Sequence, residues 1–435
     1  MKLLDRHCPG CEYCFDAGRA GSGIYWIENQ RGVWIALNET QFKRELRHCG
    51  VSPIAPRSSF ASPVDEVLLG IQHNCDVAFA GLLAGYKAGI HEMCGQRILV
   101  TQSPRFIEPK PGKWPILRAV IDGMLQDEKD KKFNQAHYFY GWTKIALEAL
   151  RAGQPRPGHA LVFAGPAGSG KSLLQNLITR LFGGRSARPY KFMTEKTEFN
   201  SDLFRSEHLM IEDEQASTDI RARRNVGAQI KIITANEEKR CEAKYRIAVD
   251  LLPFWRLSIS VNDEPENLMV LPPIDDSIED KLILLRASWK PMPMPTVKPK
   301  QRKAFWRTLL EELPAFAHFL QEWQVPPELE GDRYGLVHFH HPEILEAIDA
   351  LAPESKLLSL IKHYLDSLGD TSWGPYPAEK LERELNGSDS QYEAKKLFSF
   401  NNACGVYLGR LAKKYPGRFM SKRTSEERLW TINWP

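Results

Sequence analysis

The middle of the chain alternates short apolar runs with stretches whose apolar residues recur at helical spacing. Residues 161–164 are continuously apolar, which is typical of a strand buried on both faces of a parallel sheet. Leucine and isoleucine then recur at helical spacing up to Leu181, which predicts a helix. Further strands are predicted within residues 208–214, 230–236 and 255–265. Residues 153–292 therefore predict an α/β core with a parallel sheet.

Before this core, the pattern predicts a small α/β module and a helical segment. Residues 1–60 contain the runs expected for a hairpin and a short helix, at 24–28, 33–37 and 40–48. A stretch rich in proline and serine, 53–63, predicts a linker. Residues 61–152 are expected to form a collar-like helical segment, with a helix at 77–88 and apolar stripes between 116 and 152.

After the core, residues 293–370 predict helices, and residues 371–435 predict a mixed unit. Its expected elements are two helices and a hairpin, at 378–385, 402–414 and 417–434. This order is typical of a winged helix, whose recognition helix would offer Arg410, Lys413 and Lys414 to DNA. The alternative is a helical packing domain with ordinary surface lysines.

The composition indicates the broad class of protein and excludes few functions. The chain has 435 residues, of which 43% are hydrophobic and 26% charged, as in soluble globular proteins. No apolar run is long enough to span a bilayer, and the N-terminus lacks a signal-peptide core, so we expect an intracellular protein without membrane contact. A net charge of +4 does not by itself indicate nucleic-acid binding.

The strongest chemical motif follows the strand at 161–164. It matches G-x-x-x-x-G-K-[ST] at every fixed position, through Gly165, Pro166, Ala167, Gly168, Ser169, Gly170, Lys171 and Ser172. Glycines let the backbone N–H groups surround a phosphate, Lys171 would reach the β- and γ-phosphates, and Ser172 would hold Mg²⁺. The motif predicts ATP as ligand; the alternative is a glycine-rich turn.

Acidic and polar residues end the two later strands. Asp213 is predicted to complete the Mg²⁺ shell and Glu214 to activate water, with Glu212 as the alternative in a register shifted by one residue. Asn262 would lie near the γ-phosphate and orient the attacking water. Lys281 and Arg286 are candidates for a positive charge donated to a neighbouring subunit's ATP, a catalytic role.

A basic hairpin is predicted between these strands. Lys239 and Arg240 would lie at its tip and Lys244 on the return strand, where they would contact DNA phosphates. The basic run at 221–224 is equally well explained as a solvated helix face.

The N-terminus carries a cysteine cluster. Cys8, Cys11 and Cys14 have the spacing of zinc ligands, and His48 or Cys49 would supply a fourth. The alternative is a reduced terminal segment without metal. The remaining cysteines predict free thiols, because 8 cysteines without a secretory signal argue against a disulfide framework.

The order of these motifs resembles the superfamily 3 helicases of viruses, phages and mobile elements, in particular the helicase part of phage and poxvirus-type primase-helicases. The resemblance covers about residues 115–290. It implies an AAA+-like ATPase that forms hexameric rings round DNA, with pore hairpins that track the strand. Lys244 then matches the pore-hairpin lysine and Asn262 the sensor asparagine. The arginine finger has no direct counterpart, which leaves Arg223, Arg224 and Arg256 as further candidates.

The resemblance thus implies an ATP-dependent DNA helicase or translocase of a phage or mobile element, acting in replication as a hexamer in the bacterial host cytoplasm. Its expected partners are single-stranded or forked DNA, further copies of the chain, and a primase or replication initiator. The alternatives are an ATP-dependent initiator that does not unwind DNA, and an AAA+ motor acting on protein. Tyr245 keeps the last one open, because protein-threading pores present an aromatic residue.

Overall fold

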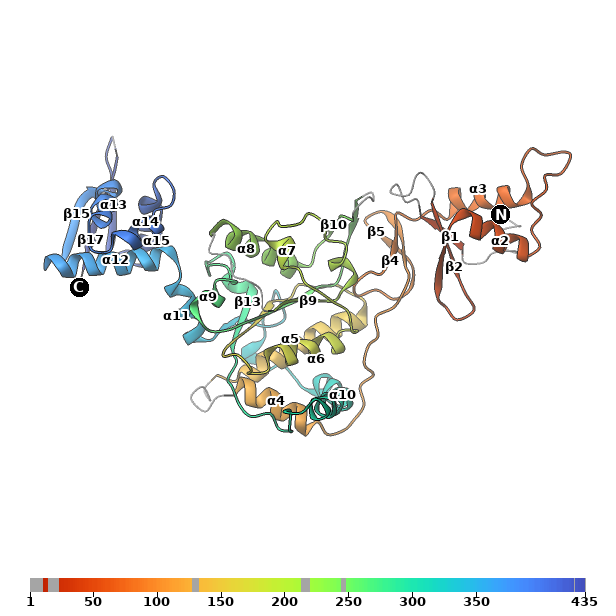
Figure 1. The fold of residues 1–435 in the computed structure, drawn as a ribbon, viewed down its shortest axis with the longest axis horizontal. Helices are drawn as coiled ribbons and strands as arrows, with labels where there is room; N and C mark the ends of the chain where they lie inside the picture. Colours follow the sequence, from red (N-terminus) through yellow and green to blue (C-terminus); the bar gives the residue numbers. More distant parts are fainter. Residues whose placement is uncertain are drawn as a thin grey trace. The chain divides into compact units, whose positions relative to one another are not determined.

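The structure, a computed structural model, describes residues 11–14, 23–126, 133–212, 220–243, 248–425 and 427–434. Contacts within the chain separate two compact units, Met1–His341 and Pro342–Pro435, which are described here one at a time. The first holds most of the helices and strands in Figure 1. No helix in the described ranges combines the length and apolar character that a membrane crossing needs.

A six-stranded sheet forms the centre of the first unit, in the order β14-β13-β7-β12-β9-β8. Every neighbouring pair is parallel. The strands are β7 (Ala160–Ala164), β8 (Ser186–Ala187), β9 (His208–Glu212), β12 (Arg256–Val261), β13 (Leu282–Arg286) and β14 (Phe339–His340). Their buried, largely apolar runs suit a sheet covered on both faces. This confirms the predicted AAA+-like P-loop NTPase core.

Helices cover both faces of this sheet (Figure 1). On one side lie α4 (Pro115–Leu125), α5 (Gln135–Ala152), α6 (Lys171–Leu181) and α10 (Pro299–Glu322). On the other lie α7 (Tyr190–Met193) and α8 (Ile220–Ala235), and α9 (Pro265–Leu268) follows β12. Short 3₁₀ turns stand at Leu203–Arg205, Glu279–Lys281 and Pro327–Leu329. One continuous core joins α4, α5, α6 and α10 to the sheet, so the phosphate-loop helix is held on both sides.

Two predictions about local structure are wrong. Residues 230–236 were expected to be a strand but belong to α8, because Val226, Ile230 and Ile233 form one buried helical stripe. The expected helix at 77–88 is instead β4 (Phe79–Gly81) and a turn, followed by β5 (Gly89–Met93) and β6 (Gln96–Val100). The N–H of Ala84 donates to Phe204 O at 2.8 Å, so tertiary contacts replace the helical hydrogen bonds there.

The N-terminal region has the predicted hairpin and helix. β1 (Cys11–Cys14), β2 (Ile24–Glu28) and β3 (Trp34–Leu37) form an antiparallel sheet, followed by α2 (Glu39–His48) and α3 (Pro63–Asn74). Asn38 caps α2 in a reciprocal capping box with Gln41. The rings of Tyr25 and Phe42 stack at 4.6 Å between centroids and join the sheet to α2.

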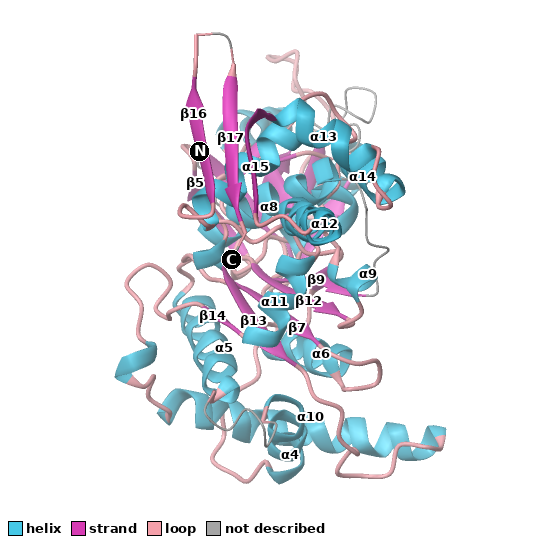
Figure 2. Cartoon of the chain, turned by 90° about the vertical axis from the view of Figure 1, so that its left-hand side faces the viewer, coloured by secondary structure: helices cyan, strands magenta, loops and turns pink. Residues whose placement is uncertain are grey.

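The second unit begins with α11 (Pro342–Ala350) and α12 (Pro353–Leu368). It continues as β15 (Ser372–Pro377), α13 (Ala378–Asn386), α14 (Gln391–Leu397), α15 (Ala403–Lys414), β16 (Phe419–Arg423) and β17 (Arg428–Asn433). The sheet order is β15-β17-β16, and the β16–β17 hairpin extends beyond the unit's helices in Figure 2. The two predicted helices and the predicted hairpin are all present, with ends within about two residues of those expected.

Candidate active site

The phosphate loop connects the end of β7 to the start of α6. Gly168 and Gly170 have φ of +76° and +97°, which favours glycine at both positions. At Gly165 the restriction is different: a Cβ there would lie 2.0 Å from Ala287 O. The loop therefore needs its glycines for conformation and for close backbone approach, and its backbone leads directly into a helix N-terminus.

The Lys171 side chain lies inside this loop and is only 8% exposed. Its Nζ donates to Gly165 O at 2.6 Å, to Pro166 O at 2.8 Å and to Asn262 Oδ1 at 3.0 Å. Asn262 follows β12, whose Val261 is in register with Ala164 of β7. The parallel register thus brings two sequence-predicted residues, 91 positions apart, into direct contact. A phosphate bound here would meet an ammonium group that is already positioned.

The strand that leads to the predicted acids ends at the same edge of the sheet. Glu212 is in register with Ser260 of β12, and its Oε2 accepts a hydrogen bond from Arg188 Nη2 at 2.7 Å. Asp213 and Glu214 lie outside the described residues, so their roles remain predictions. Glu212, the alternative acid, has an arginine partner that sequence reasoning missed, because only the sheet order places β8 beside β9.

Lys281 and Arg286 lie at opposite ends of β13. Arg286 is in register with Ala164, at the phosphate-loop edge. Lys281 precedes the strand, about 16 Å from Arg286 at the rise of an extended chain, and its Nζ pairs with Asp280. The structure therefore does not bring these two candidates together in one subunit.

The alternative arginine-finger candidates are less suitable. Arg256 is 1% exposed, and its Nη1 donates to Arg156 O and Trp255 O. Burial away from water, together with the charge of Arg156, lowers the pKa of Arg256 to about 9. Arg223 is also buried, with its Nε on Leu271 O at 3.0 Å. Both side chains are therefore held inside the fold, whereas Arg224 is exposed.

The basic hairpin exists, but its register differs from the prediction. β10 (Lys239–Cys241) pairs antiparallel with β11 (Val249–Leu251), and Lys239 is opposite Leu251. Lys239 and Arg240 therefore lie at the base of the hairpin and not at its tip. The error follows from the helix α8, which takes the residues assigned to the first strand. Lys244 lies outside the described residues.

A buried polar network lies beneath the site and was missed by sequence reasoning. Both ring nitrogens of His208 form hydrogen bonds. Nδ1 lies 2.7 Å from Thr179 Oγ1, and Nε2 lies 2.7 Å from Ser258 Oγ. Gln175 Nε2 donates to Ser258 Oγ at 2.8 Å. Desolvation, with the Arg188 charge, lowers the pKa of His208 to about 3, so the ring is neutral. The network links α6 to β9 and β12, the elements that carry the site.

An apolar wall stands beside the phosphate loop. Trp289 is 59% exposed, and a Cβ on Gly168 would lie 3.8 Å from its Nε1. A Cβ on Gly170 would lie 3.2 Å from Met292 Cε. The Ser288 N–H donates to Met124 O at 2.8 Å, which anchors this wall to the end of α4. No motif indicated these residues, since they lie more than a hundred positions from the loop.

Of the three C-terminal cations predicted to be exposed, Lys413 and Lys414 are exposed and Arg410 is half-buried. Arg410 Nη1 pairs with Glu354 Oε2 at 3.1 Å, and Lys414 Nζ with Asp349 Oδ2 at 2.7 Å. Both acids lie on the preceding helices α12 and α11. Lys413 is exposed. Sequence spacing did not reveal these two ion pairs, and the DNA contacts of Arg410, Lys413 and Lys414 remain predictions.

The structure lends no support to the zinc prediction. Cys8 lies outside the described residues, and Cys11 and Cys14 are described only as part of strand β1. Cys49, one of the two residues proposed as a fourth ligand, is an exposed free thiol. In the described part of the chain no group of histidine, cysteine and acidic residues has a metal-binding arrangement.

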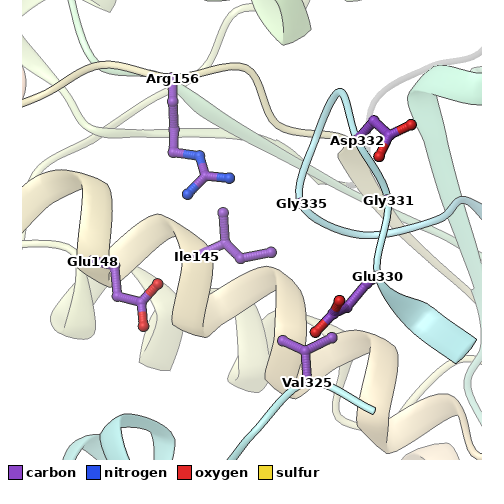
Figure 3. Close-up of a pocket in the computed structure, with 8 residues that line it drawn as sticks. All are labelled: Ile145, Glu148, Arg156, Val325, Glu330, Gly331, Asp332 and Gly335. Atoms are coloured by element: carbon purple, nitrogen blue, oxygen red, sulfur yellow. The ribbon is translucent and has the colours of Figure 1, made fainter. Parts of the chain in front are cut away.

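A cavity of about 330 Å³ lies away from the phosphate loop, between α5 and the segment 325–335 (Figure 3). Arg156 points into it, and Glu148 and Glu330 lie on other sides. Gly331 and Gly335 form the turn that closes it, and a Cβ on Gly335 would lie 2.7 Å from Arg156 Nη2. Side chains of both charges around a tight turn explain this cavity as a packing feature of the fold, and we assign it no ligand.

Comparisons with known proteins agree with this architecture. A family of unknown function (DUF5906) matches residues 163–277, and no curated protein matches the chain. Two apo structures of the NrS-1 C-terminal region are 14% identical, with TM-scores of 0.55 and 0.54, and each comparison covers 100% of this chain and 98% of that chain. At this level of identity the similarity shows a shared fold only. A JCV helicase structure is 15% identical and covers 55% of this chain and 66% of that chain; its TM-score of 0.23 supports no conclusion.

Proposed function

We propose that the chain is an ATP-driven motor that translocates on, and unwinds, single-stranded or forked DNA during replication. The observation that carries the proposal is the contact of Lys171 Nζ with Asn262 Oδ1 at 3.0 Å inside the phosphate loop. This contact joins a cation for phosphate to a polar group at the end of the neighbouring strand. Nucleotide hydrolysis needs both at one sheet edge, because charge must be neutralised while water is oriented.

The residues at this edge take the following roles. Gly165, Gly168 and Gly170 let the loop backbone bind the phosphates of ATP, and Lys171 neutralises their charge. Ser172 and Asp213 would hold Mg²⁺, which reduces the charge repulsion met by the attacking water. Asn262 orients that water and Glu214 accepts its proton. The hydroxyl of Ser172, at the second position of α6, fits such a cation.

The finer assignments belong to the same proposal. The active form is a hexameric ring of superfamily 3 type, in which Arg286 or Lys281 of one subunit acts on the ATP of the next. The hairpin that contains β10 and β11 contacts DNA in the pore, and its partners include a primase or replication initiator. The second unit, a winged helix by its element order, binds duplex DNA through Lys413 and the β16–β17 hairpin.

The winged-helix order favours one alternative, an ATP-dependent initiator that assembles on duplex DNA without unwinding it. Strand displacement separates the two functions. Purified protein should hydrolyse ATP faster with single-stranded DNA and displace an annealed strand, and Lys171→Ala should abolish both. The matched control is Lys191→Ala, at an exposed lysine of the same unit, which should retain both activities. ATP hydrolysis without strand displacement would favour the initiator, and the absence of ATP hydrolysis would refute both functions.

A further inference from the structure

A second cavity, of about 480 Å³, opens at the C-terminal end of α6. Arg105, Arg180 and Arg185 line it, and no acidic residue does among those the structure describes. The rest of the wall is largely apolar, from Leu82, Ile107, Leu310 and Leu313. Its volume lies within the range of pockets that hold small ligands, roughly 300–1,000 Å³.

One of the arginines is already neutralised. Arg185 Nε donates to Glu207 Oε2 at 2.9 Å, its Nη2 pairs with Oε1, and the Glu207 side chain is fully buried. The same carboxylate accepts the Gly85 N–H at 2.9 Å. This ion pair holds the cavity wall in place and leaves the other arginines to set the charge.

Arg105 and Arg180 are exposed, and in the described part of the chain neither guanidinium group has a hydrogen-bond or ion-pair partner. The Arg105 N–H donates to Gly183 O at 3.3 Å, which ties its backbone to the turn after α6. Arg180 lies in the last turn of α6 itself. Two arginines thus line one cavity that no acidic residue lines among the described residues, an arrangement that an anion would stabilise.

The cavity is separate from the phosphate loop. Helix α6 begins at Lys171, in the loop, and has 11 residues, so its ends are about 16 Å apart. A ligand at the far end would therefore not compete with ATP. It would contact the same helix that carries Lys171.

We propose that this cavity binds a phosphate group of single-stranded DNA, with the adjoining sugar or base on the apolar wall. Guanidinium groups bind phosphate oxygens in pairs, and bases pack on apolar surfaces beside basic grooves. The inference rests on the proposed function, which brings such a strand to the protein. It adds a DNA contact that is separate from the hairpin and from the C-terminal unit.

The test measures binding of a fluorescent oligothymidylate to the full chain by anisotropy over a range of salt concentrations. Arg105→Glu/Arg180→Glu should weaken binding at least tenfold at low salt. For single strands each lost phosphate contact reduces the salt slope by about 0.7, and the two arginines share one phosphate, so the slope should become shallower by about 0.7. Arg105→Lys/Arg180→Lys should restore most of the affinity, because it keeps both charges.

The control variant Lys300→Glu/Lys303→Glu has the same change in charge, at exposed positions early in α10, and should leave the salt slope unchanged. Melting temperature and DNA-independent ATP hydrolysis should match the wild type in all variants. An unchanged slope in the arginine variant, or an equal loss in the control, would overturn the inference. The inference would also be overturned if the arginine variant kept its oligonucleotide binding but lost binding of a mononucleotide outside the phosphate loop. If the wild type binds no DNA, the proposed function itself fails.

Discussion

Replacing Asn262 by alanine tests the contact on which the proposed function depends. The change removes the Oδ1 that accepts from Lys171 Nζ at 3.0 Å, while the ammonium keeps its contacts with Gly165 O and Pro166 O. Lys171 is 8% exposed, so water does not readily replace the lost acceptor. A hydrogen bond to a charged group contributes about 1.5–3 kcal/mol.

That free energy converts to a rate through the usual factor of about 1.36 kcal/mol per tenfold. If the contact acts in the transition state, Asn262→Ala should lower kcat between about 13-fold and 160-fold. The dissociation constant for ATP should change little, because the loop glycines and Lys171 remain. Steady-state phosphate release with saturating Mg²⁺-ATP measures the first quantity, and titration with a fluorescent ATP analogue measures the second.

Asn267→Ala is the matched control. Asn267 is another asparagine close to this sheet edge, and its Nδ2 donates to the exposed Glu264 at 2.9 Å. Its replacement should change kcat less than twofold. A kcat for Asn262→Ala within threefold of the wild type would refute the reasoning, and so would an equal loss in the control.

Three further predictions follow from the described contacts. Trp289→Phe should remove most of the change in tryptophan fluorescence on ATP binding, because this indole is 59% exposed beside Gly168; an undiminished signal would show that another of the 11 tryptophans reports the ligand. Arg185→Ala should lower the free energy of unfolding by about 3–5 kcal/mol in urea titrations, since it leaves the Glu207 carboxylate buried without its cation, whereas a loss below 1 kcal/mol would contradict the account of that pair. Burial lowers the pKa of His208 to about 3, so the unfolded chain binds more protons than the folded one between about pH 6.5 and 3. The free energy of unfolding should therefore decrease as the pH is lowered through that window. His208→Gln should make this decrease shallower by up to about 1.4 kcal/mol per pH unit.

The sequence pattern predicted the secondary structure correctly where all the residues that determine an element lie within one short stretch of the chain. The strand at 160–164, the phosphate loop and α6 are contiguous, and their glycines and apolar residues act through neighbours in the chain. The helices α13 and α15 and the terminal hairpin were predicted for the same reason. In each case the spacing of buried residues matches the period of the element.

Local patterns failed where distant contacts overrode them. The β-branched run in residues 230–236 favours a strand, yet it packs as one buried face of α8 against β12. The segment at 77–88 is rich in helix-forming residues, but Gly85 lies so close to Phe254 that a Cβ would be 2.5 Å from that side chain's Cβ. Packing against another part of the chain outweighs a propensity of less than about 1 kcal/mol per residue.

The sequence by itself determined the chemistry of the phosphate loop, because conformation, charge and helix start are encoded within eight consecutive residues, 165–172. Only the tertiary structure decided what surrounds it. The sheet order brought Asn262 to Lys171 and Arg188 to Glu212, and folding paired Arg410 and Lys414 with acids from other helices. Charges act over a few ångströms of space whatever their separation in sequence, so their partners follow from the fold and not from spacing along the chain.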